Sequence, residues 1–486
     1  MNTVPFSFSV ASLAPAIPEI ALLTLACALL VIDAFLKKRD GVLTYWLTLL
    51  TLVACALACV VTVRHARVVT FSGVFVSDPL SQVVKTIMLL TVAGTIVLSR
   101  SYLETRRMLT GEFLCLALFG ALGMMVMISA NHFLTLYLGL ELMALSQYAM
   151  VALERDSAKA TEASMKYFVL GALSSGLLLY GMSVLYGATG SLELTRVAAS
   201  IEGGQANATL AAFGLVFIVA GIAFKLGAAP FHMWIPDVYH GAATPATIII
   251  GAAPKLAAFV FVMRLLANGL QGMTGDWQQM LVFLALASMA VGNIVAIAQG
   301  NLKRMLAYST ISHMGYLLLG ILAGSSAGYS ASLFYVVAYA IMTLGSFGMI
   351  LLLSRAGFEA DALDDFKGLN QKSKWYAFMM LILMFSLAGI PPTAGFFAKL
   401  LVLQAALDAG YTWLVVVAVL LSVIGAFYYL RIVKLMYFDA PTGEITLERR
   451  LGTRWVLSGT ALATLLFGIV PAPLLNLCVN AISRSM

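Results

Sequence analysis

The chain has 486 residues, of which 61% are hydrophobic and only 10% are charged, and its formal net charge is +7. Soluble globular domains carry roughly 25% charged residues, so this composition excludes a soluble domain and indicates a membrane protein. The basic residues gather in short polar joints between apolar runs. We therefore interpret the positive charge as a signal of membrane orientation, and we expect no nucleic-acid partner.

Apolar runs long enough to cross about 30 Å of hydrocarbon as helices follow one another along the chain. The first comes after "MNTVPFSFSV", which lacks the positive region of a signal peptide, so we expect a retained span. The alternating pattern of a membrane barrel is absent. The sequence predicts an all-α polytopic membrane protein with about 14 spans. They lie near residues 15–36, 42–63, 78–99, 111–129, 131–153, 162–187, 208–235, 243–267, 277–299, 303–323, 328–354, 374–409, 412–437 and 454–480.

The joints between these spans differ in charge on the two sides of the membrane. One side holds Lys37, Lys38, Arg39, Arg100, Arg106, Arg107, Arg155, Lys159, Lys303, Arg304, Arg355, Lys367, Lys372, Lys374, Arg431, Lys434, Arg449, Arg450 and Arg454. The other side holds little beyond Arg64, Arg67, Arg196 and Arg484. By the positive-inside rule the basic side is cytoplasmic, so both termini are expected on the outer, periplasmic side.

Redox and nucleotide-binding motifs are missing from the sequence. The five cysteines, which lie in apolar runs without CxxC or CxxCH spacing, are Cys27, Cys55, Cys59, Cys115 and Cys478. This spacing suggests neither an iron–sulfur cluster nor an attached haem, and we interpret the cysteines as small core residues. No GxGxxG opens a nucleotide-binding unit and no Walker loop is present. If the chain belongs to a redox machine, the redox chemistry is expected on other subunits.

Six ionisable residues lie well inside predicted spans: Glu141, Lys225, His232, Lys255, His313 and Lys399. A charge at the bilayer centre costs about 2.5–3.5 kcal/mol on insertion scales, so it persists only where it faces protein or water. One buried Lys–Glu pair can serve only to fix helix register, and a lone histidine can be a core residue. Several central lysines together favour a functional path.

Other charged residues have a simpler interpretation. Lys166 lies near the end of its span, where its side chain can extend to the membrane surface. Arg264, Arg431 and Lys434 also lie close to predicted span ends, and we expect them to act as interfacial anchors.

Two predicted spans are interrupted by helix-breaking residues. Pro230, reinforced by Gly227 and Pro236, should divide span 208–235 into two half-helices, and "SLAGIPPTAGFFAKL" divides span 374–409 in the same way. Lys225 precedes the first break and Lys399 follows the second. Because irregular backbone at membrane depth must be covered by protein or line water, hydrated cavities are expected beside these lysines.

The broken spans are the seventh and the twelfth, so they are about five crossings apart. An odd repeat length inverts the second copy, which predicts two inverted five-helix repeats with half-channels open to opposite sides. The single membrane domain 1–486 would then contain an N-terminal part, two repeats and a C-terminal part, with boundaries at 1–110, 111–267, 277–437 and 438–486.

Five stretches carry a resemblance to a known family: "GEFLCLALFGALGMMVMISANHFLTLYLGLELMALSQYAMVAL", "EASMKYFVLGALSSGLLLYG", "GIAFKLGAAPFHMWIPDVYHGAATP", "GNLKRMLAYSTISHMGYLLLG" and "LAGIPPTAGFFAKL". From about Ser77 to Tyr437, the chain resembles the antiporter-like membrane subunits of bacterial respiratory NADH:quinone oxidoreductase, complex I. Among these, the terminal subunit is longer and the middle one has glutamate in place of Lys399. Both differences favour the group called subunit N.

The resemblance implies roles for individual residues. By motif, Glu141 is the fifth-helix glutamate, Lys225 the seventh-helix lysine, Lys255 the eighth-helix lysine and Lys399 the twelfth-helix lysine. Further polar positions on or near the same axis match Lys166, His232, Lys303 and His313. One departure is "YHGAATP", where relatives usually have another polar residue or glutamate in place of His240 and often proline in place of Ala243.

The resemblance further implies a translocase subunit of the bacterial inner membrane that moves protons outward while partner subunits carry electrons from NADH to quinone. FMN, iron–sulfur clusters and quinone would belong to those partners, with no cofactor on this chain. The implied partners are the neighbouring antiporter-like subunit, small membrane subunits, lipids and, indirectly, the peripheral redox arm. Two alternatives stay open: a subunit of a multi-subunit Na⁺(K⁺)/H⁺ antiporter, and a scaffold that transports nothing.

Overall fold

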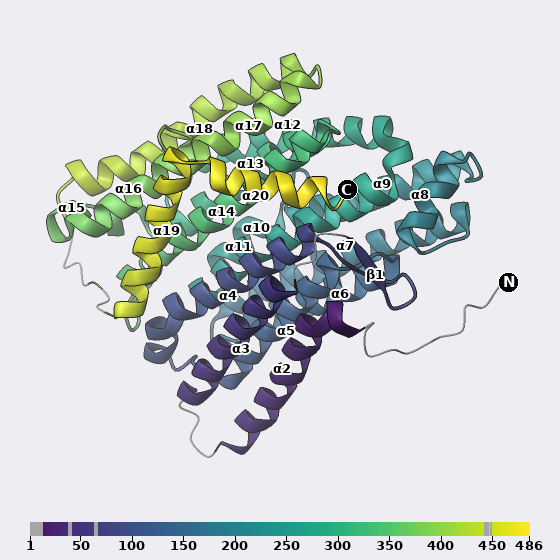
Figure 1. Cartoon of the computed structure of the whole chain (residues 1–486). Helices are drawn as coiled ribbons and strands as arrows, with labels where there is room; N and C mark the ends of the chain where they lie inside the picture. The colour runs from purple at the N-terminus through teal and green to yellow at the C-terminus, as the bar shows by residue number, and fades with distance from the viewer. Residues whose placement is uncertain (1–12, 37–40, 63–66, 442–446, 448–449) are drawn as a thin grey trace.

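A computed structural model of the chain describes residues 13–36, 41–62, 67–441, 447 and 450–486. Lys37, Lys38, Arg39, Arg64, Arg449 and residues 1–12 therefore lie outside the described residues. The molecule is a bundle of helices, with α2 and α3 on one side and α16, α17 and α18 on the opposite side (Figure 1). The predicted all-α membrane fold is confirmed.

The N-terminal part consists of three long helices and a small hairpin. Strands β1 and β2 pair antiparallel in the register Val68↔Ser77 to Thr70↔Phe75. The elements are η1 (Ala14–Ala16), α2 (Ile17–Phe35), α3 (Val42–Val61), β1 (Val68–Thr70), β2 (Phe75–Ser77) and α4 (Pro79–Thr105).

The first predicted repeat contains the expected break, since α9 ends at Leu226 and α10 begins at Trp234. The second half lies mostly beyond the predicted end of the span at residue 235, and Pro236, which was expected to reinforce the break, lies in the first turn of α10. The last helix of this repeat continues into a π-helical stretch, η2. The elements are α5 (Gly111–Ile128), α6 (Phe133–Val151), α7 (Ala158–Thr189), α8 (Leu194–Glu202), α9 (Ala208–Leu226), α10 (Trp234–Gly241), α11 (Thr244–Val262) and η2 (Met263–Gly269).

The second predicted repeat also contains a broken helix, in which α16 and α17 are separated by residues 389–393. The elements of this part are η3 (Gln271–Met273), α12 (Thr274–Ile297), α13 (Leu302–Leu322), α14 (Ser326–Leu353), η4 (Leu363–Phe366), α15 (Leu369–Lys372), α16 (Lys374–Ala388), α17 (Ala394–Asp408) and α18 (Thr412–Phe438). The two breaks are observed, whereas the repeat boundaries stay a prediction.

Most long helices begin at a polar residue that satisfies the first free backbone N–H groups. The side chain accepts a hydrogen bond from an N–H of the first turn at Asp78, Thr110, Ser157, Asn207, Asn301, Ser325 and Ser373. Such caps contribute about 0.5–2 kcal/mol each. They fix where α13 begins, and hence where Lys303 in its first turn lies.

The C-terminal part differs from the prediction of one span over 454–480. Two helices form it, α19 (Leu451–Ile469) and α20 (Ala472–Ser483), and they are bent by 83° with respect to each other. Proline at 471 and 473 accounts for the bend, because proline cannot continue the hydrogen bonding of the preceding turn. In Figure 1, α20 runs across the bundle. Just after its end, Ser485 Oγ accepts a hydrogen bond from Leu80 N of α4 at 3.0 Å.

In the described part of the chain, 12 helices are long and apolar enough to cross a membrane, and the pair α19–α20 passes the same test together. The pair α16–α17 matches the predicted span 374–409, but each half has only 15 residues. Fourteen crossings thus stay a prediction. Burial identifies the centre of the bundle: α11, α13 and α14 are almost fully enclosed, whereas α2, α7 and α18 leave an apolar face open.

Several joints that the charge pattern assigns to one side contact one another. Arg106 pairs with Glu359 at 2.8 Å, Lys303 lies 3.5 Å from the same carboxylate, and Arg450 pairs with Glu104. We call this side, formed by residues 100–107, 154–159, 237–242, 299–304 and 354–368, the basic face. Together with the contacts of Lys159 with His240 and of Arg304 with Asp237, these pairs show that the joints lie on one face of the molecule.

Candidate functional site

Lys255 lies at the first helix break. Helix α9 ends at Leu226 because Gly227 adopts φ +80°, a left-handed conformation that glycine favours. The Nζ atom of Lys255, from α11, donates hydrogen bonds to Leu226 O at 2.7 Å and to Lys225 O at 3.3 Å. Carbonyls at a helix C-terminus lack intrahelical partners and carry the negative end of the helix dipole. The break therefore provides a binding site for the Lys255 side chain.

The second break has the same arrangement. Helix α16 ends at Ala388, and Gly389 has φ +86°. Nζ of Lys399, from α17, donates to Ala388 O at 2.9 Å and to Ser422 Oγ at 2.9 Å. The sequence associated Lys225 with the first break, but the side chain that contacts the broken end there is that of Lys255.

Lys225 and Glu141, both in the first predicted repeat, do not form an ion pair. Lys225, in the last turn of α9, donates to Ser175 Oγ of α7 at 3.4 Å. Glu141, at the middle of α6, is partly buried, and its Oε1 atom is buried without a hydrogen-bond partner. No ion pair within 4.0 Å joins the two in the described structure. The side chains of Glu141 and Lys225 are therefore not paired with each other in this structure.

A cavity of about 20 Å³ is lined by both Lys225 and Lys255. Gln147, Tyr167 and Trp234 also line it, and the Lys255 Nζ atom lies 5.4 Å from the centroid of the Trp234 ring. A space of this size holds about one water molecule. It can therefore link the two ammonium groups through a single bridging molecule.

His313 lies in α13, in the second predicted repeat. It is 3% exposed, and its Nδ1 and Nε2 atoms contact the hydroxyls of Tyr335 at 2.6 Å and Tyr429 at 3.1 Å. Tyr335 stacks on Tyr316 with ring centroids 6.5 Å apart, and Lys399 Nζ lies 4.9 Å from the Tyr316 centroid. A row of tyrosines therefore connects His313 to Lys399. Within the described residues, no unbroken chain of side-chain hydrogen bonds joins Lys255 to His313.

The other predicted positions lie outside this row. Lys166 is 43% exposed and pairs with Glu162 and Asp237, in agreement with the surface interpretation. His232 lies in the first break, and its Nδ1 atom has no hydrogen-bond partner. Lys303 is 2% exposed, and its Nζ donates to Ala242 O at 2.6 Å, on the basic face. Of Lys166, His232, Lys303 and His313, only His313 contacts the row of tyrosines, and we call His313, together with Lys225, Lys255 and Lys399, the central row.

Arg264 corrects one sequence-based expectation. It was expected to anchor at a membrane interface, but it is fully buried in η2 and pairs at 2.7 Å with Asp78, which is also fully buried. A second buried pair, Lys85 with Glu19, joins α4 to α2. Neither pair is predicted from the sequence, because their charges do not lie at the centres of predicted spans. Asp78 did carry a signal, since "SDPLS" is a helix start with an acidic cap before proline.

We expect Arg264→Met to destabilise the protein, because it would leave the Asp78 carboxylate buried without its partner. Breaking a buried pair from one side costs about 3–5 kcal/mol. Arg196→Met is the matched control, since the Arg196 side chain is 77% exposed in its pair with Glu193 and such pairs contribute about 0–1 kcal/mol. The measurement is the melting temperature of the purified assembly that contains this chain. Equal melting temperatures for both variants would contradict the expectation.

Residues 130–425 match the family model described as NADH:quinone oxidoreductase/Mrp antiporter, TM. A chain of the Mrp complex from Dietzia has the same fold, with a TM-score of 0.84 at 23% identity over 98% of both chains. A chain of respiratory complex I from Thermus thermophilus with bound aureothin has a TM-score of 0.83 at 31% identity, over 95% of this chain and 100% of that one. Fold and family model together define an antiporter-like membrane protein.

Relatives that match over nearly the whole length narrow the family further. NADH-quinone oxidoreductase subunit N of Thiobacillus denitrificans is 59% identical over 477 residues, covering 98% of this chain and 99% of the relative. The protein of the same name from Nitrosomonas europaea is 59% identical over 473 residues, covering 97% and 98%. The chain belongs to the NADH-quinone oxidoreductase subunit N family.

Proposed function

We propose that the chain is the proton-translocating subunit N of an NADH:quinone oxidoreductase. The observation that carries this proposal is the row of buried and half-buried protonatable groups in the bundle interior: Glu141, Lys225, Lys255, His313 and Lys399. Such groups inside a membrane domain are costly unless they face protein or water, and they mark proton relays. Membership of the family gives the row its function.

The Glu141–Lys225 contact is the switch in this proposal. At an effective dielectric constant of about 20, opposite charges 4 Å apart attract by about 4 kcal/mol. Closing the contact holds a proton on Lys225, and opening it favours transfer through the cavity towards Lys255. Outward movement of one proton costs about 2.3 kcal/mol per 100 mV, which the chain cannot supply itself. Electron transfer in the partner subunits supplies it.

Water completes the path in the proposal. Buried polar atoms without a protein partner occur on Glu141, Gln147 and Tyr148 of α6 and on Ser174 of α7. Such atoms are normally satisfied by ordered water. Water at these positions would connect Glu141 to Lys225.

The surroundings of the chain are part of the proposal. The chain would lie in the inner membrane of a bacterium with both termini periplasmic, next to another antiporter-like subunit and small membrane subunits. FMN, iron–sulfur clusters and quinone would be held by partner subunits, so the residues of this chain move protons only.

The alternative of Na⁺ or K⁺ exchange predicts a different cation dependence. Hard cations need several oxygen ligands, whereas the central row consists mainly of lysine and histidine. We expect NADH-driven proton uptake into inverted vesicles to proceed at the same rate when choline replaces Na⁺ and K⁺. Proton movement is followed with a pH-sensitive dye, with an uncoupler as control. Loss of the signal in choline would favour the antiporter alternative.

A further inference from the structure

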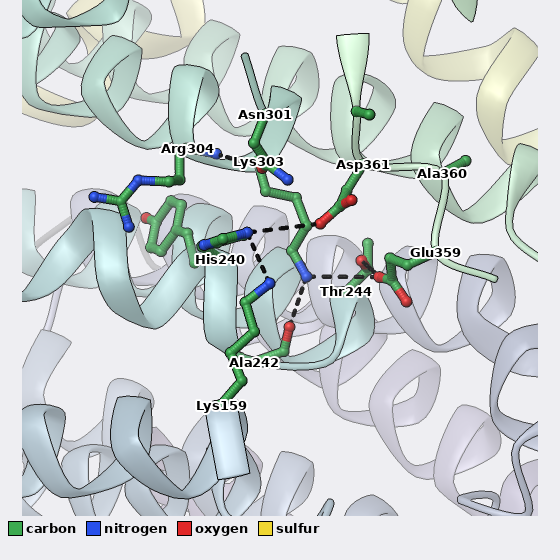
Figure 2. Close-up of polar contacts among 12 residues, drawn as sticks. Lys159, His240, Ala242, Thr244, Asn301, Lys303, Arg304, Glu359, Ala360 and Asp361 are labelled. Atoms are coloured by element: carbon green, nitrogen blue, oxygen red, sulfur yellow. Dashed lines mark hydrogen bonds and ion pairs between the residues drawn. The ribbon is translucent and has the colours of Figure 1, made fainter. Parts of the chain in front are cut away.

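His240 lies at the end of α10, where this short helix meets α7, α13 and residues 355–362 on the basic face (Figure 2). Its side chain is 25% exposed. The Nε2 atom lies 2.7 Å from Nζ of Lys159 and 3.9 Å from Oδ2 of Asp361. One ring nitrogen thus lies between a cation and an anion that come from different parts of the chain.

The short contact with Lys159 fixes the protonation state of the ring in this conformation. An ammonium group has only donors, so Nε2 must accept the hydrogen bond and cannot carry a proton. The charged groups that face His240 are Lys159 from α7, Asp361 from the segment after α14, and Lys303 and Arg304 from α13. Burial and the Lys159 charge lower the pKa of His240 to about 4, so the neutral ring is favoured at neutral pH.

When a proton binds Nε2, this atom can no longer accept a hydrogen bond from Lys159, so the ring must change its hydrogen-bond partner. The imidazolium would be repelled by Lys159 and attracted to the Asp361 carboxylate. The backbone of Asp361 is held at the start of α13, where its carbonyl accepts a hydrogen bond from Leu302 N at 2.6 Å. Protonation would therefore transfer the end of α10 from a contact with α7 to a contact with the start of α13.

The start of α13 leads into the protein interior. Lys303 donates to Ala242 O just beyond His240, and Thr310 and His313 follow on the same face of α13 at about two and three turns. Thr310 Oγ1 accepts a hydrogen bond from Tyr339 at 2.7 Å, and the Tyr339 ring lies 5.3 Å from that of His313. A polar stripe thus runs from the basic face to the central row.

We propose that His240 is a proton-uptake residue of the basic face, which takes a proton from water by exchanging Lys159 for Asp361 and releases it inward along the polar face of α13. The inference rests on the proposed function. The proton binds Nε2 when the Lys159 hydrogen bond opens, and it leaves when that hydrogen bond forms again, so no other reactant is needed.

The first test measures the titration of His240 in the assembled complex. Diethyl pyrocarbonate acylates neutral imidazole, and peptide mass spectrometry reads the modification of His240 alone. For the wild type, labelling should stay constant between about pH 8 and about pH 6 after correction with a free imidazole standard. With Lys159→Gln the midpoint of labelling should move to higher pH than in the wild type, because the lysine charge that helps to lower the His240 pKa is removed while burial remains. Identical titration of wild type, Lys159→Gln and the exposed control Lys434→Gln would overturn the proposal.

The second test measures proton pumping in His240→Gln. The glutamine oxygen can still accept the Lys159 hydrogen bond, so the structural contact is kept, but the side chain cannot take a proton. We expect pumping to fall about twofold or more at pH 8, where protons are scarce, with a smaller deficit at pH 6. Pumping equal to wild type at both pH values would overturn the proposal, although the proposed function would stand. That function fails only if Glu141 and Lys225 variants also pump normally.

Discussion

Glu141→Gln is expected to abolish proton pumping and to slow coupled quinone reduction by about tenfold or more, without loss of assembly. The amide keeps the size of the side chain but can neither carry the negative charge that holds a proton on Lys225 nor exchange a proton itself. The Oε1 atom of Glu141 is already buried without a partner, so the substitution removes no hydrogen bond of the described structure. Its effect should therefore fall on turnover and not on folding.

Lys225→Met should give the same loss, because it removes the other member of the switch. The matched controls are Glu112→Gln, an exposed carboxylate on the neighbouring α5, and Lys434→Met, a lysine whose side chain is 69% exposed. Both should pump like the wild type. Three quantities are measured together in vesicles: the rate of NADH oxidation, the pH gradient and the amount of assembled complex. Together they distinguish a proton-translocating subunit from a cation antiporter subunit and from a scaffold. Normal proton-to-electron stoichiometry in assembled Glu141 and Lys225 variants would refute the switch, and loss of assembly would favour the scaffold alternative.

Much of the fold could be predicted from the sequence, because hydrophobic length and helix breakers act locally. The apolar runs defined the long helices to within a few residues, and Pro230 and Pro391–Pro392 located both breaks. The bend between α19 and α20 was missed even though "VPAP" lies within the predicted span. The apolar run predicts one crossing, but the two prolines interrupt its backbone hydrogen bonds, and this interruption outweighs the apolar character.

The contacts of the charged residues could be predicted only in part. The central positions of Glu141, Lys255 and Lys399 followed from their distance to the span ends. That Lys255 binds the end of α9, 29 residues earlier in the chain, depends on how two helices pack, which no local pattern encodes. Arg264 was misassigned for the same reason, because its partner Asp78 lies at the start of another helix. His240 was noticed only as a departure from the family, and its position between Lys159 and Asp361 required the fold.

Lys399→Met should stop proton release from the second half of the path while leaving the first half intact. The ammonium group donates to Ala388 O and Ser422 Oγ and lies over the Tyr316 ring, so it is the terminal protonatable group of the row that starts at His313. The methionine side chain fills the same space without a charge. We expect pumping to be lost, as in Glu141→Gln, because a proton that reaches His313 has no acceptor beyond it.

Ser422→Ala is the graded control for this prediction. The substitution removes the Ser422 hydroxyl, one of the two acceptors of the Lys399 ammonium group, and leaves the other acceptor, Ala388 O, in place. The lysine should therefore stay at the break, and we expect pumping to be only partly reduced. The measured quantity is again the number of protons moved per NADH oxidised in assembled complexes. If Lys399→Met pumps normally, the lysine serves only to satisfy the free carbonyl at the end of α16. Lys255, which makes the same contact at the end of α9, would then be the next residue to test for a purely structural role.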